Sequence, residues 1–198
     1  MCIRDSFMVA AACLSDSDLT IPNVGVNPTR STIIDVLRYI GVGCDIADSS
    51  EVCNEPRATI RIRRRINNNS DGPTVLGGDL IPSIIDEIPI LAILGTQIEG
   101  GLEIRDASEL RHKETDRIEA VVENLRRMGA AVEEFPDGLK VQRSDLDGAV
   151  VDSFGDHRIA MAFAVAGLLA NGETEITNAE CVDISFPGFF DTLATVVQ

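Results

Sequence analysis

The chain repeats one structural pattern three times, and this repetition limits its possible folds more than any other feature. Each copy holds an apolar helical stretch, a short turn rich in Gly or in Ser and Asp, and an extended edge of the form Ile-x-(Asn/Asp)-(Val/Ala). The helical stretches are expected at 7–14, 88–98 and 158–170, and the extended edges at 19–24, 102–107 and 174–179. The pattern predicts a few supersecondary units packed about a common axis.

The first two copies also continue in the same order. A loop and a second helix come after each edge, and these helices end at Gly41 and Gly129. Strand-like segments come next, at 44–47, 59–64 and 74–76 in the first copy and at 131–135, 138–142 and 148–152 in the second. The unit spans about 70–90 residues, which is too long for a solenoid repeat and favours an α/β fold.

Charge and composition exclude several kinds of partner. The 198 residues carry a formal net charge of -15, which argues against nucleic acid or an anionic membrane as a partner. The apolar stretch Ile84–Ile98 is broken by Asp86, Glu87 and Pro89, so it is no membrane span. Five cysteines without a CxxC pair or a nearby histidine indicate reduced thiols in the core of a cytoplasmic protein, without a metal site.

The N-terminal residues differ in character from the apolar stretch beside them. Residues 1–6 have neither the apolar region of a signal peptide nor the composition of a transit peptide. They run directly into the apolar stretch Phe7–Leu14, which is typical of the interior of a buried helix. We expect residues 1–6 to be a leader that is foreign to the fold or disordered.

A charged cluster at 109–117 precedes the apolar helical face at 118–128. The spacing places Lys113, Glu114 and Arg117 in the first turn of that helix. Cations there oppose the helix dipole, so a capping role does not explain them, whereas an anionic ligand does. Arg117 can grip a carboxylate or phosphate with two parallel hydrogen bonds, and Glu114 beside it can donate or accept a proton.

Two further clusters stand at helix starts. Asp86 before Pro89 is typical of a helix cap, but its carboxylate can also act as a general base. Asp156 is expected to cap the helix that His157 and Arg158 open, with Arg158 directed at the same anion as Arg117. If the copies pack symmetrically, these helix starts converge. Two cationic helix starts in an acidic chain point to a polyanionic substrate.

Five motifs, in order, resemble the C-terminal part of the EPSP synthase (3-phosphoshikimate 1-carboxyvinyltransferase) family. They are Asn27-Pro-Thr-Arg30, Leu80-Ile-Pro-Ser-Ile-Ile-Asp-Glu-Ile-Pro89, Leu110-Arg-His-Lys-Glu-Thr-Asp-Arg-Ile118, Asp152-Ser-Phe-Gly-Asp-His-Arg-Ile-Ala-Met161 and Ser185-Phe-Pro-Gly-Phe-Phe190. The resemblance implies an inverted α/β, barrel-like fold of βαβαββ units in a two-domain enzyme. Residues 7–198 are then part of one enolpyruvyl transferase domain, with about two and a half units.

The resemblance also implies an activity, the transfer of the enolpyruvyl group of phosphoenolpyruvate to the 5-hydroxyl of shikimate 3-phosphate. This reaction belongs to chorismate and aromatic amino-acid biosynthesis, and it implies no cofactor and a monomeric, cytoplasmic full-length enzyme. By position, Asp86 matches the base on the 5-hydroxyl, and Glu114 matches the residue that moves a proton at the methylene carbon.

The remaining matched positions are implied to bind the substrates. Lys113 matches a substrate-contacting lysine, and Arg117 and Arg158 match ligands of phosphoenolpyruvate, with His157 beside them. Asp86 contacts substrate as well. The chain departs from some relatives at Ile184, where they carry lysine, and at Glu109, where they carry asparagine.

Two alternatives stay open. One is the sister enolpyruvyl transferase that acts on UDP-N-acetylglucosamine, although the motifs at 113–117 and 155–158 favour shikimate 3-phosphate. The other is a non-catalytic module that binds anions, because the resemblance does not extend to the family's other half. In the two-domain enzyme, the two halves form the walls of the active-site cleft. We expect a polypeptide that supplies only one of these walls to be a poor enzyme alone.

Overall fold

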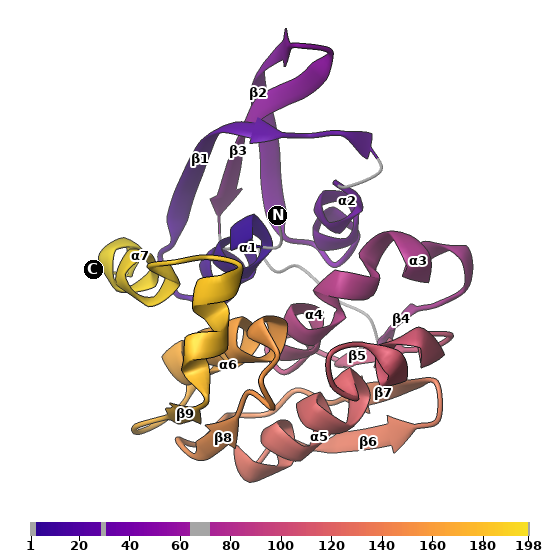
Figure 1. The fold of residues 1–198 in the computed structure, drawn as a ribbon. Coiled ribbons are helices and arrows are strands. Elements are labelled where there is room, and N and C mark those ends of the chain that lie inside the picture. Colours follow the sequence, from indigo (N-terminus) through magenta and orange to yellow (C-terminus); the bar gives the residue numbers. More distant parts are fainter. Residues whose placement is uncertain (1–2, 29–30, 64–71, 198) are drawn as a thin grey trace.

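The computed structural model describes residues 3–28, 31–63 and 72–197 (Figure 1). The helices are α1 Ile3–Cys13, α2 Thr32–Tyr39, α3 Ile81–Ile84, α4 Ile88–Gly95, α5 Arg117–Arg127, α6 His157–Leu169 and α7 Phe189–Val196. The 3-10 turns are η2 Gly78–Leu80, η3 Ile85–Glu87, η4 Ser108–His112 and η5 Ala179–Ile184. The strands are β1 Asp18–Gly25, β2 Gly43–Val52, β3 Glu55–Arg63, β4 Thr74–Leu76, β5 Leu102–Ile104, β6 Val132–Phe135, β7 Gly138–Val141, β8 Val150–Asp152 and β9 Glu175–Thr177.

The strand pairing confirms the repeat found in the sequence. One sheet has the order β4-β5-β7-β6, in which β4 runs parallel to β5 and the other pairs are antiparallel. The order β1-β3-β2 repeats the β5-β7-β6 part with the same antiparallel pairing. The parallel pair β8-β9 repeats the β4-β5 part. One complete βαβαββ unit therefore stands between two partial ones.

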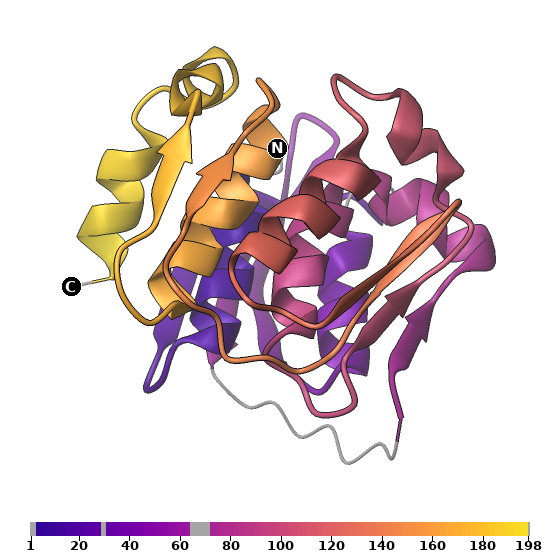
Figure 2. The same cartoon turned by 90° about the horizontal axis from the view of Figure 1, so that it is seen from below.

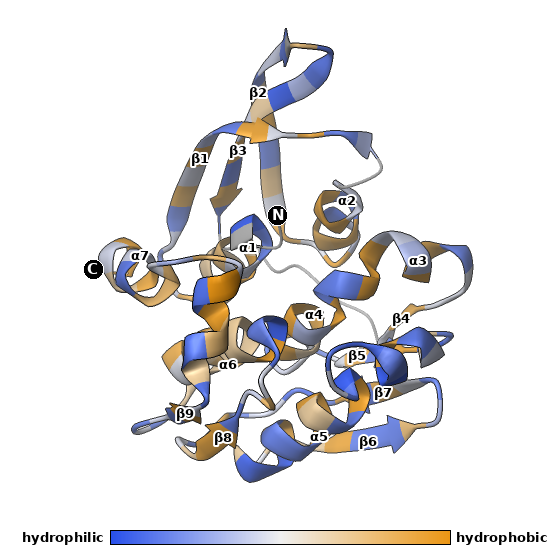
Figure 3. Ribbon diagram, viewed as in Figure 1, coloured by the Kyte–Doolittle hydropathy of each residue, from blue (hydrophilic) through white to orange (hydrophobic). Residues whose placement is uncertain are grey.

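One helix from each unit lies at the centre of the molecule. Helices α1, α4 and α6 contact one another, and the three sheets lie around them (Figures 1 and 2). Every residue of α4 is buried, and the helix is apolar along its length (Figure 3). A helix that is apolar on all sides belongs in a core. The predicted packing about a common axis is thus confirmed.

The N-terminal boundary differs from the expectation. Helix α1 begins at Ile3, and Asp5 and Ser6 are buried in it at 1% and 3% exposure. Arg4 holds this turn in place, because its guanidinium donates to Asp5 and to the carbonyl oxygen of Gly25. The expectation of a separate leader at residues 1–6 is therefore wrong for residues 3–6, which continue the helix.

Some surface expectations were met and others were not. Arg61 and Arg63 pair with Asp18 and Asp45 on the outer, solvated face of β3. The expectation of buried thiols holds for Cys13 and Cys44, but Cys53 is exposed and Cys181 is half-buried. Arg30, the last residue of the first of the five motifs, lies outside the described residues. Among the described residues, no helix is long and apolar enough to cross a membrane.

Candidate active site at three helix starts

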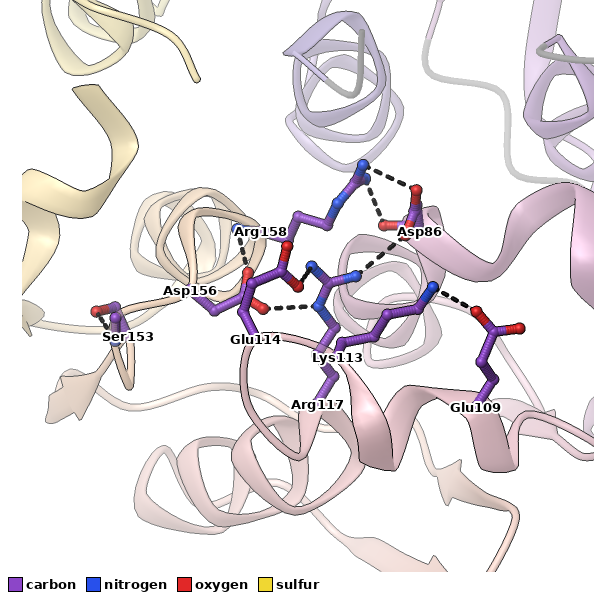
Figure 4. Close-up of polar contacts among 9 residues, drawn as sticks. Asp86, Glu109, Lys113, Glu114, Arg117, Ser153, Asp156 and Arg158 are labelled. Atoms are coloured by element: carbon purple, nitrogen blue, oxygen red, sulfur yellow. Dashed lines mark hydrogen bonds and ion pairs between the residues drawn. The ribbon is translucent and has the colours of Figure 1, made fainter. Parts of the chain in front are cut away.

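Three helix starts converge on one ionic cluster (Figure 4). Asp86 comes from η3 before α4, Arg117 is the first residue of α5, and Arg158 lies in the first turn of α6. Hydrogen bonds join these residues across separations of 31 and 72 positions in the sequence. The convergence predicted from the repeats is therefore confirmed.

Arg117 is the centre of the cluster. Its side chain is 1% exposed, and its guanidinium donates from Nε to Asp156 at 2.7 Å, from Nη1 to Asp86 at 3.1 Å and from Nη2 to Glu114 at 2.7 Å. A buried guanidinium is stable only when carboxylates or other acceptors replace the lost water. Besides the ligand role expected for it, Arg117 has a structural role, because its side chain joins elements from two units of the fold.

Asp86 lies between two guanidinium groups. Arg158 donates to its carbonyl oxygen at 2.8 Å and to its Oδ2 at 3.0 Å, while Arg117 reaches Oδ1. The Asp86 side chain is 41% exposed, so a ligand can reach it. The capping interpretation of Asp86 is wrong: the N-cap residue of α4 is Glu87, and among the described residues no side chain caps that helix start. The carboxylate of Asp86 is thus turned to the cluster.

Lys113 and Glu114 lie just before α5 and not in its first turn, where they were expected. They belong to the loop between η4 and α5, because Asp116 is the N-cap of α5 and accepts a hydrogen bond from the Glu119 amide at 3.0 Å. Lys113 donates to Glu109 at 2.6 Å, and the Glu114 side chain is 55% exposed beside Arg117. The prediction that both sit in the first helical turn is therefore wrong, although both border the cluster.

Asp156 has two tasks, one of which the sequence predicted. Its Oδ1 accepts a hydrogen bond from the Arg158 amide at 2.8 Å, which caps α6 as expected. Its Oδ2 accepts from the buried Arg117, and the Asp156 side chain is itself 0% exposed. His157, beside it, is half-buried, and burial lowers the pKa of its imidazole although Asp156 opposes this shift. His157 is therefore a neutral hydrogen-bonding group at neutral pH.

Sequence reasoning missed two residues that hold the β8–α6 loop. The buried amide of Asn124 in α5 donates to the Asp152 carbonyl at 2.7 Å and accepts from the Asp152 amide at 3.0 Å. Ser153, also buried, donates to the Asn178 carbonyl and accepts from the Gly155 amide. The sequence offered one signal for Asn124: it is a polar residue beside the apolar positions of a predicted amphipathic helix.

Glu87 is a third missed residue. Burial raises the pKa of its carboxyl to about 7, and the neighbouring Asp5 and Asp86 add to the shift while Arg158 opposes it. Glu87 lies next to Asp86 in the sequence, but its carboxyl is neutral over part of the physiological pH range. It therefore adds less negative charge to the site than the sequence indicates.

The balance of charges determines what the cluster can do. Two guanidinium groups, from Arg117 and Arg158, face three carboxylates, from Asp86, Glu114 and Asp156. Asp86 and Glu114 are bonded to the same guanidinium, and both are accessible to solvent. An anionic ligand that binds the guanidinium groups would displace one of these two carboxylates and leave it beside the ligand, ready to exchange a proton. In the described ranges, no group of three His, Cys, Asp or Glu side chains is arranged to hold a metal ion.

The fold and the site together define an α/β protein of repeated βαβαββ units, with cations and carboxylates gathered where the helices begin. Its residues 3–193 match the family model of EPSP synthase (3-phosphoshikimate 1-carboxyvinyltransferase). The chain belongs to the EPSP synthase family.

Individual relatives agree with this assignment. The chain is 50% identical over 191 residues to the 3-phosphoshikimate 1-carboxyvinyltransferase of Desulforamulus reducens, and 52% identical over 191 residues to that of Pelotomaculum thermopropionicum. Both matches cover 96% of this chain, and 44% and 43% of the relatives. The chain therefore spans less than half the length of these curated relatives.

Solved structures show the same fold. EPSP synthase from Acinetobacter baumannii superposes with a TM-score of 0.90 at 32% identity, covering 98% of this chain and 45% of that one. The enolpyruvyl transferase NikO from Streptomyces tendae has a TM-score of 0.76 at 19% identity over 98% of this chain and 42% of its own, which is a likeness of fold alone. The α/β fold expected from the sequence is confirmed, and the roles expected for the individual site residues stay predictions.

Proposed function

We propose that the full-length protein to which this chain contributes transfers the enolpyruvyl group of phosphoenolpyruvate to the 5-hydroxyl of shikimate 3-phosphate. One observation carries the proposal: the accessible carboxylate of Asp86 is held between Arg117 and Arg158 where three helix starts meet. The site thus offers a proton acceptor directly beside two groups that bind anions. Membership of the EPSP synthase family supports phosphoenolpyruvate and shikimate 3-phosphate as these anions.

The two accessible carboxylates match the two places at which this reaction moves protons, the 5-hydroxyl and the C3 carbon. In the addition step, the oxygen of the 5-hydroxyl bonds to C2 of phosphoenolpyruvate while Asp86 takes the hydroxyl proton. Glu114 gives a proton to the C3 methylene. In the elimination step, the bond from C2 to the phosphate oxygen breaks, and Glu114 recovers a proton from C3. Phosphate leaves with the proton that came from the hydroxyl. Atoms and charge balance without a redox partner, so we propose no cofactor.

The cations bind and orient the two substrates in this mechanism. Arg158 is 13% exposed in its side chain and Lys113 is 23% exposed, so both can reach a bound anion after a small movement. Arg117 is buried and holds Asp86 and Glu114 from behind, so an anion meets its guanidinium only by displacing one of these two carboxylates. His157, being neutral, can donate or accept a hydrogen bond without adding charge.

Two other functions remain as outcomes of the test. An enolpyruvyl transferase acting on UDP-N-acetylglucosamine would use the same donor, but the named relatives favour shikimate 3-phosphate. A non-catalytic anion-binding module fits a chain that spans less than half of its relatives' length. For the full-length protein, we propose a cytoplasmic monomer, which its mass in solution and cell fractionation would check.

The test needs the rest of the protein. A hybrid protein, made of this chain joined to the part of a full-length relative that it does not cover, would be assayed for phosphate release with both substrates and with each alone. We expect release only with both, and a loss of about 10²–10⁴-fold in turnover for Asp86→Asn. Asp79→Asn, an exposed change in η2, is the matched control and leaves turnover unchanged. Release with UDP-N-acetylglucosamine instead, or turnover of Asp86→Asn within a few-fold of the parent, would contradict the proposal.

A further inference from the structure

Arg111 makes an unusual set of hydrogen bonds next to the candidate site. From the end of η4, its Nη1 donates to Asp116 at 2.8 Å and its Nη2 to Glu134 at 2.9 Å. The same guanidinium donates to the backbone carbonyl oxygens of Phe135 at 2.6 Å and Pro136 at 2.9 Å. One side chain thus joins η4, the N-cap of α5 and the turn between β6 and β7.

The Arg111–Asp116 bond closes the loop that carries two site residues. Lys113 and Glu114 lie between its two ends, so their backbone is tied at both sides of a short segment. Asp116 is fixed by the same contact, and its other oxygen caps α5, the helix that begins with Arg117. Any movement of Arg111 is therefore passed to the loop that carries Lys113 and Glu114.

The turn that Arg111 grips is itself held firmly. Asp137 accepts a hydrogen bond from the Asp106 amide through Oδ2 at 3.0 Å, and its carbonyl oxygen accepts from the Ala107 amide at 2.7 Å. These contacts fix the start of η4 to the same turn whose carbonyls fix its end through Arg111. The β6–β7 turn is therefore a rigid support for the loop at 113–116.

We propose that Arg111 is a positioning residue that sets the placement of Glu114 and Lys113 against the substrates by tying their loop to the β6–β7 turn. This inference rests on the proposed function and extends it to a residue outside the ionic cluster. Arginine suits the role because its planar fork supplies several fixed N–H directions, whereas a lysine ammonium on a flexible stem does not. Half-buried Asp116 and Glu134 neutralise its charge, so Arg111 is not expected to bind the ligand itself.

The first test separates positioning from stability. In the hybrid protein, we expect Arg111→Lys and Arg111→Ala to lower kcat by about 10- to 100-fold, since a misplacement of about 1 Å can have that effect. KM for phosphoenolpyruvate should change less than kcat, because Arg117 and Arg158 are not altered. Arg143→Lys and Arg143→Ala, which alter an exposed pair with Glu99, are the matched controls. Unchanged kcat in both Arg111 variants would overturn the proposal.

A double-mutant cycle tests the route of the effect. If Arg111 acts through Glu114, then Arg111→Ala should lower kcat much less in a Glu114→Gln background than in the parent. Fully multiplicative losses would show that Arg111 acts by another route, which overturns the positioning role. Guanidinium ions added to the Arg111→Ala protein should restore part of kcat and should leave the Arg143→Ala protein unchanged.

Amide hydrogen exchange gives a readout that does not depend on turnover. In the 198-residue chain, Arg111→Ala should speed exchange in the segment 113–116, while amides of α4 and α6 keep their protection. If the hybrid proves inactive with both substrates, the proposed function fails, but faster exchange confined to 113–116 would still favour the positioning role of Arg111. Unchanged exchange there would overturn it whatever the activity.

Discussion

The buried pair of Arg117 and Asp156 leads to the sharpest stability prediction. Their side chains are 1% and 0% exposed, and the contact is 2.7 Å long. Asp156→Asn keeps the shape of the side chain and an oxygen that can still cap α6, but it removes the charge. Removing one partner of a buried ion pair typically costs about 3–5 kcal/mol, because the other charge stays buried without compensation.

The other partners of Arg117 bring the expected loss to the lower end of that range. Asp86 and Glu114 remain bonded to the guanidinium, but their side chains are 41% and 55% exposed, so solvent screens them. We therefore expect Asp156→Asn to lower the free energy of unfolding by about 3 kcal/mol. Asp156→Ala should lose roughly 1 kcal/mol more, because it also removes the cap of α6.

Urea unfolding of the 198-residue chain, followed by circular dichroism, measures these changes. Asp79→Asn is the control, with a change expected within about 0.5 kcal/mol. Adding Arg117→Met to Asp156→Asn removes the uncompensated cation, so the double variant should lose less than the sum of the two single variants. A loss below about 1 kcal/mol for Asp156→Asn would refute the argument, because that is the value of an exposed pair.

Three further predictions concern other parts of the molecule. Burial raises the pKa of Glu87 from 4.5 to about 7, so its contribution to stability is complete below pH 4.5 and is lost as the pH rises through 7. At about 1.36 kcal/mol per pH unit the loss reaches about 3 kcal/mol. Between pH 5 and pH 8, the free energy of unfolding should change less in Glu87→Gln than in the parent chain. An equal change in the two proteins would count against this account. Gly138→Ala should destabilise by about 1–3 kcal/mol in urea unfolding, since a Cβ there would lie 1.9 Å from the Ile104 carbonyl oxygen; an unchanged midpoint would contradict the tight approach of β7 to β5. Arg158→Ala in the hybrid protein should weaken phosphoenolpyruvate binding by about 2–5 kcal/mol in calorimetry with shikimate 3-phosphate saturating, and isotherms that overlay the parent's would remove Arg158 from the site.

The sequence was sufficient for the architecture because the repeat is a local pattern. Alternation and helical spacing place β5, α5, β6 and β7 close to their observed bounds, and the glycines at 41 and 129 mark helix ends with φ of 93° and 79°. Convergence of the helix starts could also be predicted, since equivalent units packed about one axis bring equivalent ends together. The residues of the cluster could therefore be named before their contacts were known.

The individual contacts could not be predicted in the same way. Asp86 was expected as a cap because Asp is a common N-cap residue, but two guanidinium groups from distant elements attract its carboxylate more strongly. The burial of Arg117 and the hydrogen bonds of Asn124 to the Asp152 backbone depend on which loops pack against α5. That packing has no local sequence pattern. The roles of Arg111 and Glu87 arise in the same way, from side chains and burial contributed by other parts of the chain.

The central claim is that the three helix starts form one site for two anions, and a binding measurement tests it most directly. Phosphoenolpyruvate would be titrated into the hybrid protein by calorimetry, first alone and then with saturating shikimate 3-phosphate, with inorganic phosphate as the competing anion. We predict tighter binding of phosphoenolpyruvate when shikimate 3-phosphate is present, and the loss of this coupling in Asp86→Asn. Equal affinity in both titrations, matched by inorganic phosphate, would contradict the claim and indicate a simple anion-binding module.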